Sequence, residues 1–291
     1  MQPLYDWQPA ENTTVSSHPI TAEEYGDFRE FLEKACGIVL GDNKQYLVSS
    51  RLNRILAEYE LESLGQLVRV LRDHRSSALR ERIIEAMTTN ETSWFRDNHP
   101  FQTLRDTVFP QLAKMRQGTV RIWSAACSSG QEPYSISMVV HEYQMANPGA
   151  LTGEVQIVAT DISPAMLRDA RAGRYDALAM ARGLSPERKE RYFRPHGDTW
   201  EVISPIRARV QFRELNLLQS YALLGRFDVI FCRNVLIYFS SKSKRDIVVR
   251  MAKALKPGGY LFLGGSESIS GLSDAFEMVR SPGGVVYRLK S

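Results

Sequence analysis

The amino-acid sequence predicts an α/β protein in two parts, a small all-helical N-terminal domain and a larger doubly wound domain around a parallel sheet. Two features of the 291 residues predict this fold class. Over residues 20–88, apolar side chains recur at steps of three and four, as on amphipathic helices. Beyond Phe109, short runs rich in Val, Ile and Phe alternate with helical patterns. That alternation favours a parallel sheet with helices on both faces.

The chain should begin with a flexible tail over residues 1–19, which contains Pro, Ser, Thr and Asn without an apolar period. A first helix is expected from Thr21, where apolar residues follow at helical spacing: Tyr25, Phe28, Phe31 and Leu32. Gly37 and Gly41 interrupt this pattern. Three more helices are expected in "NKQYLVSSRLNRILAEY", "SLGQLVRVLRDH" and "ALRERIIEAMT". The four helices define a helical domain over residues 20–88.

The second domain, residues 89–291, should contain the sheet. Strands are expected in "VRIWSAA", "VQIVATD", "FDVIFCRN" and "GYLFLGG". Helices are expected between them, in "PYSISMVVHEY", "SPAMLRDARAG" and "SSKSKRDIVVRMAKAL". The final "FEMVRSPGGVVYRLK" holds two strand-like pieces around Pro-Gly-Gly, which predicts a hairpin at one edge of the sheet.

One connection is too long for this alternation. The helix after Asp161 and the strand at Phe227 are separated by about fifty residues, more than a connection normally takes. Within it "SPERKERYF" has a helical pattern, whereas "TWEVIS" and "ARVQFRELNL" alternate as strands do. We therefore expect a small inserted β-subdomain near residues 190–215.

Composition excludes several classes of protein. The hydrophobic fraction of 43% is ordinary for a globular protein, and the net charge of +4 says little about nucleic acid. No apolar run reaches the length of a membrane span and no signal peptide opens the chain, so we expect a cytoplasmic protein. The three cysteines are far apart and odd in number, and the five histidines form no ligand-spaced pair. We expect neither disulfides nor a metal site.

The segment "RIWSAACSSGQEPYSI", residues 121–136, begins as a buried strand and continues as a loop with one glycine. It lacks both the dinucleotide fingerprint and the Lys-Ser/Thr pair of a P-loop. Glu132 would repel a diphosphate but suits a ligand with an ammonium group, which favours S-adenosylmethionine over NAD or ATP. Alternatively, Glu132 caps a helix that begins near Pro133.

Polar residues follow the other expected strands. In a doubly wound sheet, ligands bind beyond the carboxyl ends of the strands. Asp161 ends the second strand, where an acid can accept hydrogen bonds from both ribose hydroxyls. Asn216 ends a later strand, and Arg233 and Asn234 end "DVIFCRN".

These segments resemble the CheR-type methyltransferases, which methylate glutamates of chemotaxis receptors. The resemblance runs from about residue 20 to the end and depends on "TTNETSWFRD", "WSAACSSGQEPYSI", "ATDIS", "NLL", "FDVIFCRNVLIYF" and "LKPGGYLFLGGSES", in this order. It implies a helical domain joined to a Rossmann-like methyltransferase domain with a small β-subdomain. It also implies nine contacts to S-adenosylmethionine: Asn90, Thr92, Arg96, Glu132, Asp161, Asn216, Leu217, Arg233 and Asn234.

The family reaction transfers the sulfonium methyl group to the γ-carboxylate of receptor glutamates and leaves S-adenosylhomocysteine. An ionised carboxylate is already a nucleophile at pH 7, so no general base is needed. We expect Arg96 and Tyr238 to be the catalytic residues, Arg96 by orienting the carboxylate and Tyr238 by directing the methyl group or the attacking oxygen. Without the resemblance, Tyr238 would be interpreted as a buried aromatic, and Thr88 with Glu91 has the spacing of a helix-capping box.

The helical domain is expected to recognise the cytoplasmic helical bundle of methyl-accepting chemotaxis receptors. "NKQYLVSSRLNR" carries three basic residues and no acid: Lys44, Arg51 and Arg54. Such a face would attract a bundle that bears glutamates, although a solvated surface helix is the usual meaning of scattered Lys and Arg. The hairpin in "RPHGDTWEVISPI" is shorter than in family members that tether to a receptor peptide, so we expect no tether. We expect a monomer recruited to membrane receptor arrays.

Two other functions remain open. One is a methyltransferase acting on nucleic acid or a small molecule. It would need a basic stripe with aromatics for base stacking, and "RNVLIY" lacks the double proline of amino-methylating loops. A non-catalytic adaptor would bind the cofactor and signal through its helical domain.

Overall fold

The computed structural model describes residues 19–73, 76–115, 118–151 and 153–290, which form two compact units. The helical unit extends to Leu32 and resumes over Leu40–Met87, and the α/β unit combines Glu33–Val39 with the chain from Thr88 onward. The tail expected over residues 1–19 lies outside the described residues except for Pro19. None of the described helices has the length and apolar character needed to cross a membrane.

The helical unit contains the four expected helices: α1 (Ala22–Cys36), α2 (Gln45–Glu58), α3 (Leu64–Arg72) and α4 (Ser77–Met87). Its core is built from the apolar positions that repeat along them, such as Phe28 and Leu52, which are fully buried. Glu24 and Thr21 cap α1 reciprocally, because each accepts a hydrogen bond from the other's backbone N–H, at 3.1 and 3.2 Å. The Thr21 N–H, followed by the Gly65 N–H that also donates to this carboxylate, lowers the pKa of Glu24.

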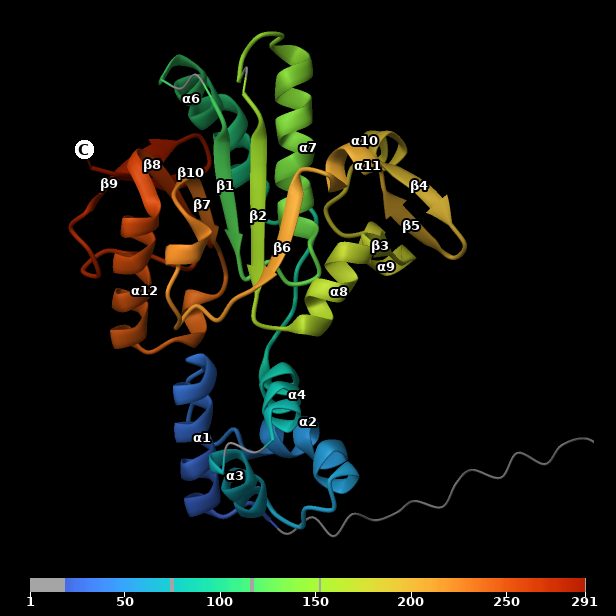
Figure 1. Ribbon diagram of the computed structural model, residues 1–291, viewed down its shortest axis with the longest axis vertical. Helices are drawn as coiled ribbons and strands as arrows, with labels where there is room; N and C mark the ends of the chain where they lie inside the picture. Colours follow the sequence, from blue (N-terminus) through green and yellow to red (C-terminus); the bar gives the residue numbers. More distant parts are fainter. Residues whose placement is uncertain (1–18, 74–75, 116–117, 152, 291) are drawn as a thin grey trace, which may run out of the picture. The chain divides into compact units, whose positions relative to one another are not determined.

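The α/β unit is built on a seven-stranded sheet (Figure 1). Its strands are β1 (Val120–Ala125), β2 (Val155–Asp161), β6 (Val210–Glu214), β7 (Phe227–Cys232), β8 (Leu255–Leu263), β9 (Phe276–Ser281) and β10 (Gly284–Leu289). The order is β6-β2-β1-β7-β8-β10-β9, and the first five strands are parallel. β9 and β10 form the expected antiparallel hairpin at one edge.

Helices cover both faces of this sheet, which confirms the doubly wound architecture. Successive residues of the strands enter different cores: Ile122 packs in the cluster that includes α7 (Gln131–Ala146), and Trp123 in the cluster that includes α12 (Ser241–Ala254). α8 (Pro164–Ala172) contacts β2 and β6. The switch in strand order falls between β1 and β7, so the loops that follow these two strands meet at the carboxyl edge of the sheet.

Three short helical pieces precede β1 and were not predicted from the sequence: α5 (His99–Thr103), the π-helical η1 (Leu104–Val108) and α6 (Phe109–Met115). Pro100 lies in the first turn of α5, where a missing N–H costs no intrahelical hydrogen bond, whereas Pro110 comes just after η1 inside a continuous helical run. Phe101, Leu104 and Phe109 anchor the segment in the core.

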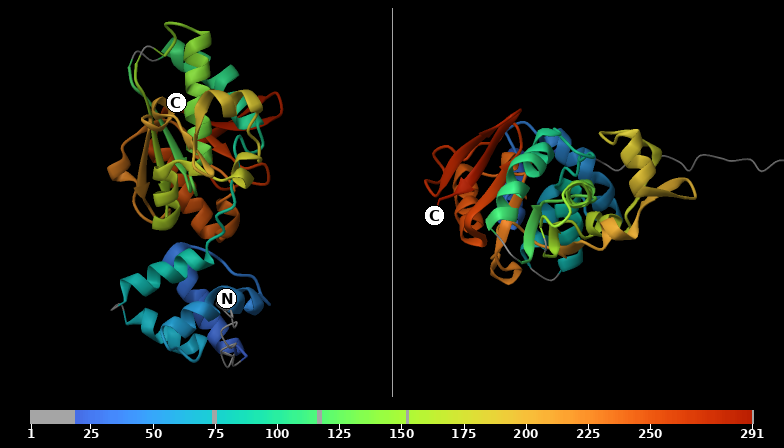
Figure 2. Two further views of the ribbon diagram at one scale, coloured as in Figure 1. Left: turned by 90° about the vertical axis from the view of Figure 1, so that its right-hand side faces the viewer. Right: turned by 90° about the horizontal axis from the view of Figure 1, so that it is seen from above.

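A separate three-stranded antiparallel sheet forms the β-subdomain, in the order β3 (Arg174–Tyr175), β5 (Thr199–Val202), β4 (Phe193–His196). The subdomain also contains α9 (Ala177–Met180), α10 (Pro186–Tyr192) and α11 (Ser204–Arg207). Within the α/β unit, it lies at the opposite end from the C-terminal hairpin (Figures 1 and 2).

These bounds differ from the insertion expected near residues 190–215. The small sheet already begins at Arg174, and β6 pairs in parallel with β2 in the main sheet. β6 is an edge strand of the main sheet, and several of its residues are exposed. Its alternation of apolar and polar residues therefore looks like that of a strand in a small antiparallel sheet, which is why the sequence assigned it to the insertion.

Candidate functional site

The loop after β1 folds back onto the end of β2. Cys127 N–H donates to the Thr160 carbonyl at 2.9 Å, and Ser128 N–H donates to Oδ2 of Asp161 at 2.7 Å. Gly130 has a φ of +95°, and a Cβ there would lie 2.9 Å from the Ala170 Cβ. Only glycine meets both the left-handed conformation and this close approach.

Asp161 lies at the carboxyl end of β2 and is only 6% exposed. Its second oxygen, Oδ1, accepts the N–H of Ser163 at 2.9 Å. Burial raises the pKa of Asp161, and the backbone N–H donors act against that shift. A carboxylate can accept about four hydrogen bonds, so acceptor capacity remains beyond the Ser128 and Ser163 bonds.

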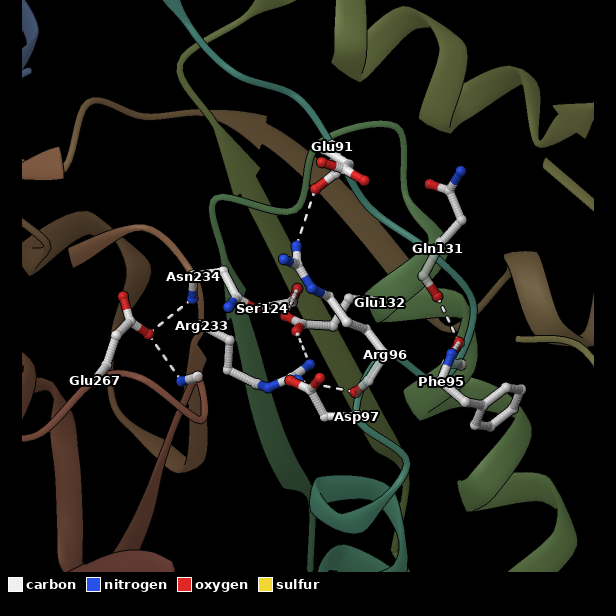
Figure 3. Close-up of polar contacts among 12 residues, drawn as sticks. Glu91, Phe95, Arg96, Asp97, Ser124, Gln131, Glu132, Arg233, Asn234 and Glu267 are labelled. Atoms are coloured by element: carbon white, nitrogen blue, oxygen red, sulfur yellow. Dashed lines mark hydrogen bonds and ion pairs between the residues drawn. The ribbon is translucent and has the colours of Figure 1, made fainter. Parts of the chain in front are cut away.

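Glu132 has both roles considered for it, since it lies in the first turn of α7 and also takes part in a polar cluster (Figure 3). Ser124 donates its hydroxyl to Oε1 of Glu132 at 2.8 Å, and Arg233 donates from Nη1 to Oε2 at 3.0 Å. Ser124 is on β1 and Arg233 follows β7. Through Ser124 and Arg233, Glu132 therefore links the ends of β1 and β7 at the switch point.

Arg233 is the centre of this cluster. Its side chain is 1% exposed, and Nη2 donates to the Arg96 carbonyl at 2.8 Å and to Oδ2 of Asp97 at 2.7 Å. Nε is buried and has no hydrogen-bond partner among the described residues. The sequence indicated Arg233 and Glu132 but not their partners Asp97 and Ser124, because no local pattern shows that Asp97 lies beside Arg233 or Ser124 beside Glu132.

The segment that carries Arg96 is strained. Phe95, Asp97 and Asn98 have φ values of +47°, +64° and +49°, which non-glycine residues rarely adopt. The Arg96 guanidinium is half-buried and donates from Nη1 to the Glu91 carbonyl at 3.0 Å (Figure 3). Most N–H donors of the Arg96 guanidinium therefore have no acceptor among the described residues. The backbone that carries Arg96 has a strained conformation, which the contacts around it must hold.

The β-subdomain holds this segment in place. Trp94 is fully buried, with its ring edge-on to Tyr175 and Phe193 at centroid distances of 4.8 and 5.1 Å. Its backbone N–H donates to the Arg182 carbonyl at 3.1 Å. A Cβ on Gly183 would collide with the Trp94 carbonyl.

A second contact fixes the next residue. The Arg188 guanidinium, from α10, lies 3.8 Å from the centre of the Phe95 ring and donates two 2.8 Å hydrogen bonds to Glu142 of α7. The insertion therefore positions Arg96, a role the sequence did not indicate.

Two other expected cofactor residues precede Arg96. The Asn90 carbonyl accepts the hydroxyl of Ser128 at 2.8 Å, and Thr92 is half-buried. The alternative of a capping box at Thr88 and Glu91 is wrong, because residues 88–93 form no helix and Glu91 instead forms an ion pair with Arg182 at 2.8 Å.

The loops after β6 and β7 carry the remaining expected residues. Asn216 donates to the Ala35 carbonyl at 2.8 Å, and Leu217 is buried. Asn234 has a φ of +55°. Tyr238 is half-buried, its carbonyl accepts the Val39 N–H at 2.8 Å, and its hydroxyl has no hydrogen-bond partner among the described residues.

A pocket of about 470 Å³ adjoins the Arg233–Asp97 pair, and His99, Glu267 and Tyr287 help to line it. Burial, followed by the positive charge of Arg233, lowers the pKa of His99. Its imidazole is therefore neutral at pH 7.

The three basic residues expected to bind substrate lie in the helical unit and differ in their surroundings. Arg51 donates to the Met87 carbonyl at 2.9 Å, at the end of α4. Arg54 is 91% exposed and pairs with Glu58 at 3.0 Å, and Lys44 is exposed beside Tyr46. Arg51 thus has a structural partner, whereas Lys44 and Arg54 face solvent.

Comparison with known proteins gives the family of the chain. Residues 90–285 match the family described as CheR methyltransferase, SAM binding domain, and residues 23–88 match its all-alpha domain. The chain belongs to the CheR methyltransferase family. It is 58% identical to Chemotaxis protein methyltransferase 1 of Pseudomonas aeruginosa, over 90% of this chain and 96% of that protein.

Other relatives agree with this assignment. This CheR protein is 55% identical to Chemotaxis protein methyltransferase Cher2 of Pseudomonas putida, over 92% of this chain and 98% of the relative. It is 37% identical to Chemotaxis protein methyltransferase of Escherichia coli, over 89% of this chain and 88% of the relative. The protein is a chemotaxis methyltransferase that uses S-adenosylmethionine, as its sequence motifs predicted.

The residues of this CheR protein suit that cofactor. The buried Asp161 retains acceptor capacity of the kind that ribose hydroxyls would use, and Glu132, paired with Arg233, is a carboxylate of the kind that a cationic ligand would need. The raised pKa of Asp161 shows that its charge is poorly solvated in the protein alone. Hydrogen bonds from a ligand would relieve that cost.

Proposed function

We propose that this CheR methyltransferase methylates the γ-carboxylate of glutamates in the cytoplasmic helical bundle of methyl-accepting chemotaxis receptors, giving methyl esters for sensory adaptation. The observation that carries the proposal is the state of Arg96. Its backbone carbonyl accepts a hydrogen bond from Arg233, the partner of Glu132, and the one hydrogen bond of its guanidinium within the described residues goes to a neutral carbonyl. Arg96 can therefore orient an incoming carboxylate.

The chemistry requires positioning more than proton transfer. Bound S-adenosylmethionine supplies a methyl group on a sulfonium and leaves as S-adenosylhomocysteine. The acceptor glutamate is ionised at pH 7, because the reference pKa is about 4.3. Arg96 orients this carboxylate, and the Tyr238 hydroxyl, which has no hydrogen-bond partner among the described residues, directs the attacking oxygen. Arg96 must not hold the carboxylate so tightly that attack is suppressed.

A methyl-transfer assay tests the reaction class. Incubation with cofactor carrying a labelled methyl group and with receptor cytoplasmic fragments should label the receptor, and mild base should release the label as methanol. A label that resists base would indicate an N-methyltransferase, and label on added nucleic acid would support the nucleic-acid alternative. An adaptor would label nothing while still binding the cofactor.

Recognition of the receptor is assigned to the exposed basic residues of α2 and its N-cap, Lys44 and Arg54. Arg51 is not part of this proposed recognition surface, because its guanidinium donates to a carbonyl at the end of α4. The β4–β5 hairpin has a turn of only two residues, Gly197 and Asp198, which supports recruitment to receptor arrays without a tethered peptide. We propose that the enzyme acts there as a monomer.

Reversing the charge of Lys44 and Arg54 to Glu should raise the KM for receptor by about tenfold at low salt, because exposed charges steer association. The salt dependence of receptor binding should weaken, and cofactor affinity should stay at the parent value. Steady-state kinetics at several salt concentrations, with calorimetry for the cofactor, measures both.

The matched control reverses Lys242 and Lys253, which are exposed on α12 and give the same change in net charge. An equal rise in KM from both pairs would show that total charge acts, and that Lys44 and Arg54 form no recognition surface.

A further inference from the structure

Glu267, in the loop after β8, accepts hydrogen bonds from four backbone N–H groups, three in the loop after β7 and one in its own loop. Oε2 accepts from Asn234 at 2.7 Å and from Gly264 at 2.8 Å, and Oε1 accepts from Val235 at 3.0 Å and Ile237 at 3.3 Å. Figure 3 shows the Glu267 carboxylate turned toward the backbone of Asn234. Three of the four donors belong to the loop that leads from Asn234 to Tyr238.

This loop needs such a partner. Asn234 has a φ of +55°, and η3 (Leu236–Tyr238) is one turn of 3-10 helix, which leaves its first N–H groups without intrahelical acceptors. A single carboxylate satisfies several of these donors at once. Hydrogen bonds to an ionised acceptor are stronger than those to a neutral one. The conformation of the loop therefore depends on the charge and position of Glu267.

The neighbouring glycine permits the contact. A Cβ on Gly264 would lie 2.8 Å from Oε2 of Glu267 and 2.9 Å from the backbone nitrogen of Asn234. A Cβ on Gly265 would meet nothing within 4 Å. A side chain at residue 264 would therefore push the Glu267 carboxylate away from Asn234. This steric requirement is independent of the hydrogen bonds and points to the same contact.

We propose that Glu267 is a positioning residue for methyl transfer, which sets the backbone of residues 234–238 and thereby places the Tyr238 hydroxyl. The inference depends on the proposed function for the role of Tyr238. Glu267 acts through this loop and does not touch the reacting groups.

The test compares Glu267→Gln, Gly264→Ala and Gly265→Ala with the parent. A glutamine amide keeps the shape of the side chain but turns an NH₂ group toward backbone donors. Glu267→Gln and Gly264→Ala should lower kcat at saturating cofactor and receptor by about 10- to 100-fold, the effect of a small misplacement in an active site. Gly265→Ala should behave as the parent does.

A double mutant separates positioning from general weakening. Glu267→Gln combined with Tyr238→Phe should be no slower than the slower single variant, within about twofold, because both changes remove the contribution of the same hydroxyl. Multiplicative losses would mean that Glu267 does not act through Tyr238, and the inference would be overturned.

Hydrogen exchange gives a readout that does not depend on the substrate. Amides of residues 234–237 should exchange faster in Glu267→Gln and Gly264→Ala, and at the parent rate in Gly265→Ala. Unchanged exchange in the first two variants overturns the inference even where receptor labelling fails. Absence of base-labile label with the parent enzyme would instead overturn the proposed function.

Discussion

Replacing Arg233 with Met is expected to reduce methyl transfer by about 100-fold or more, because Arg96 and Asp97 lose the group that fixes their position. The Arg233 guanidinium holds Glu132, the Arg96 carbonyl and Asp97 together while remaining 1% exposed. Its removal leaves Glu132 as a nearly buried charge without its cation. Breaking a buried pair from one side costs about 3–5 kcal/mol. Activity and stability should therefore fall together.

Receptor methylation at saturating cofactor, with urea unfolding followed by circular dichroism, measures the two effects. Arg245→Met is a suitable control, since Arg245 is exposed on α12 and its substitution removes the same charge. Arg233→Lys should recover part of the stability but little of the activity, because an ammonium cannot reproduce the planar geometry of the fork. Near-parent activity in Arg233→Met would remove the cluster from the catalytic site.

Replacing Asp161 with Ala is expected to lower cofactor affinity by at least about tenfold, because it removes the acceptor that we propose for two ribose hydroxyls, and charge-assisted hydrogen bonds contribute about 1.5–3 kcal/mol each. The free energy of unfolding of the ligand-free protein should change much less than the free energy of cofactor binding. Burial raises the pKa of Asp161 in the folded state, so the ionised carboxylate opposes folding above its unfolded pKa, and this penalty disappears as the pH falls. At neutral pH, the alanine removes that penalty together with the bonds to the Ser128 and Ser163 N–H groups.

Calorimetry gives the affinity, and thermal unfolding with and without S-adenosylhomocysteine gives the stability. The rise in Tm on ligand addition should shrink, because stabilisation by a ligand follows its concentration relative to Kd. Asp169→Ala is the control, since Asp169 is an exposed acid on α8. Unchanged affinity in Asp161→Ala would exclude this carboxylate from the cofactor site.

The candidate site was predictable where a residue follows directly from a strand. Asp161 and Arg233 were indicated because each follows a run of buried residues, and the carboxyl ends of parallel strands meet at one edge. Glu132 was indicated because an acid in a glycine-containing loop excludes a diphosphate. Each inference needed only local sequence and one general rule.

Other residues of the site were not predictable in this way. Asp97, Ser124 and Glu267 become partners of Arg233, Glu132 and the Asn234 backbone only when distant segments meet. Arg51 shows the same limit. The sequence grouped it with Lys44 and Arg54 as a basic face, but its guanidinium is directed to the carbonyl of Met87, 36 residues later in the chain.

By itself, the sequence determined the helical domain, the strands of the doubly wound sheet, the acids that suit S-adenosylmethionine and the CheR family. Local periodicity and motif order carry that information. The tertiary structure decided that β6 belongs to the main sheet, that the β-subdomain holds Trp94 and Phe95, and that Arg233 and Glu267 fix the two loops of the site. The physical reason is that a strand's partner and a polar group's acceptor depend on strand order and packing. These contacts join residues far apart in the chain, where no local pattern records them.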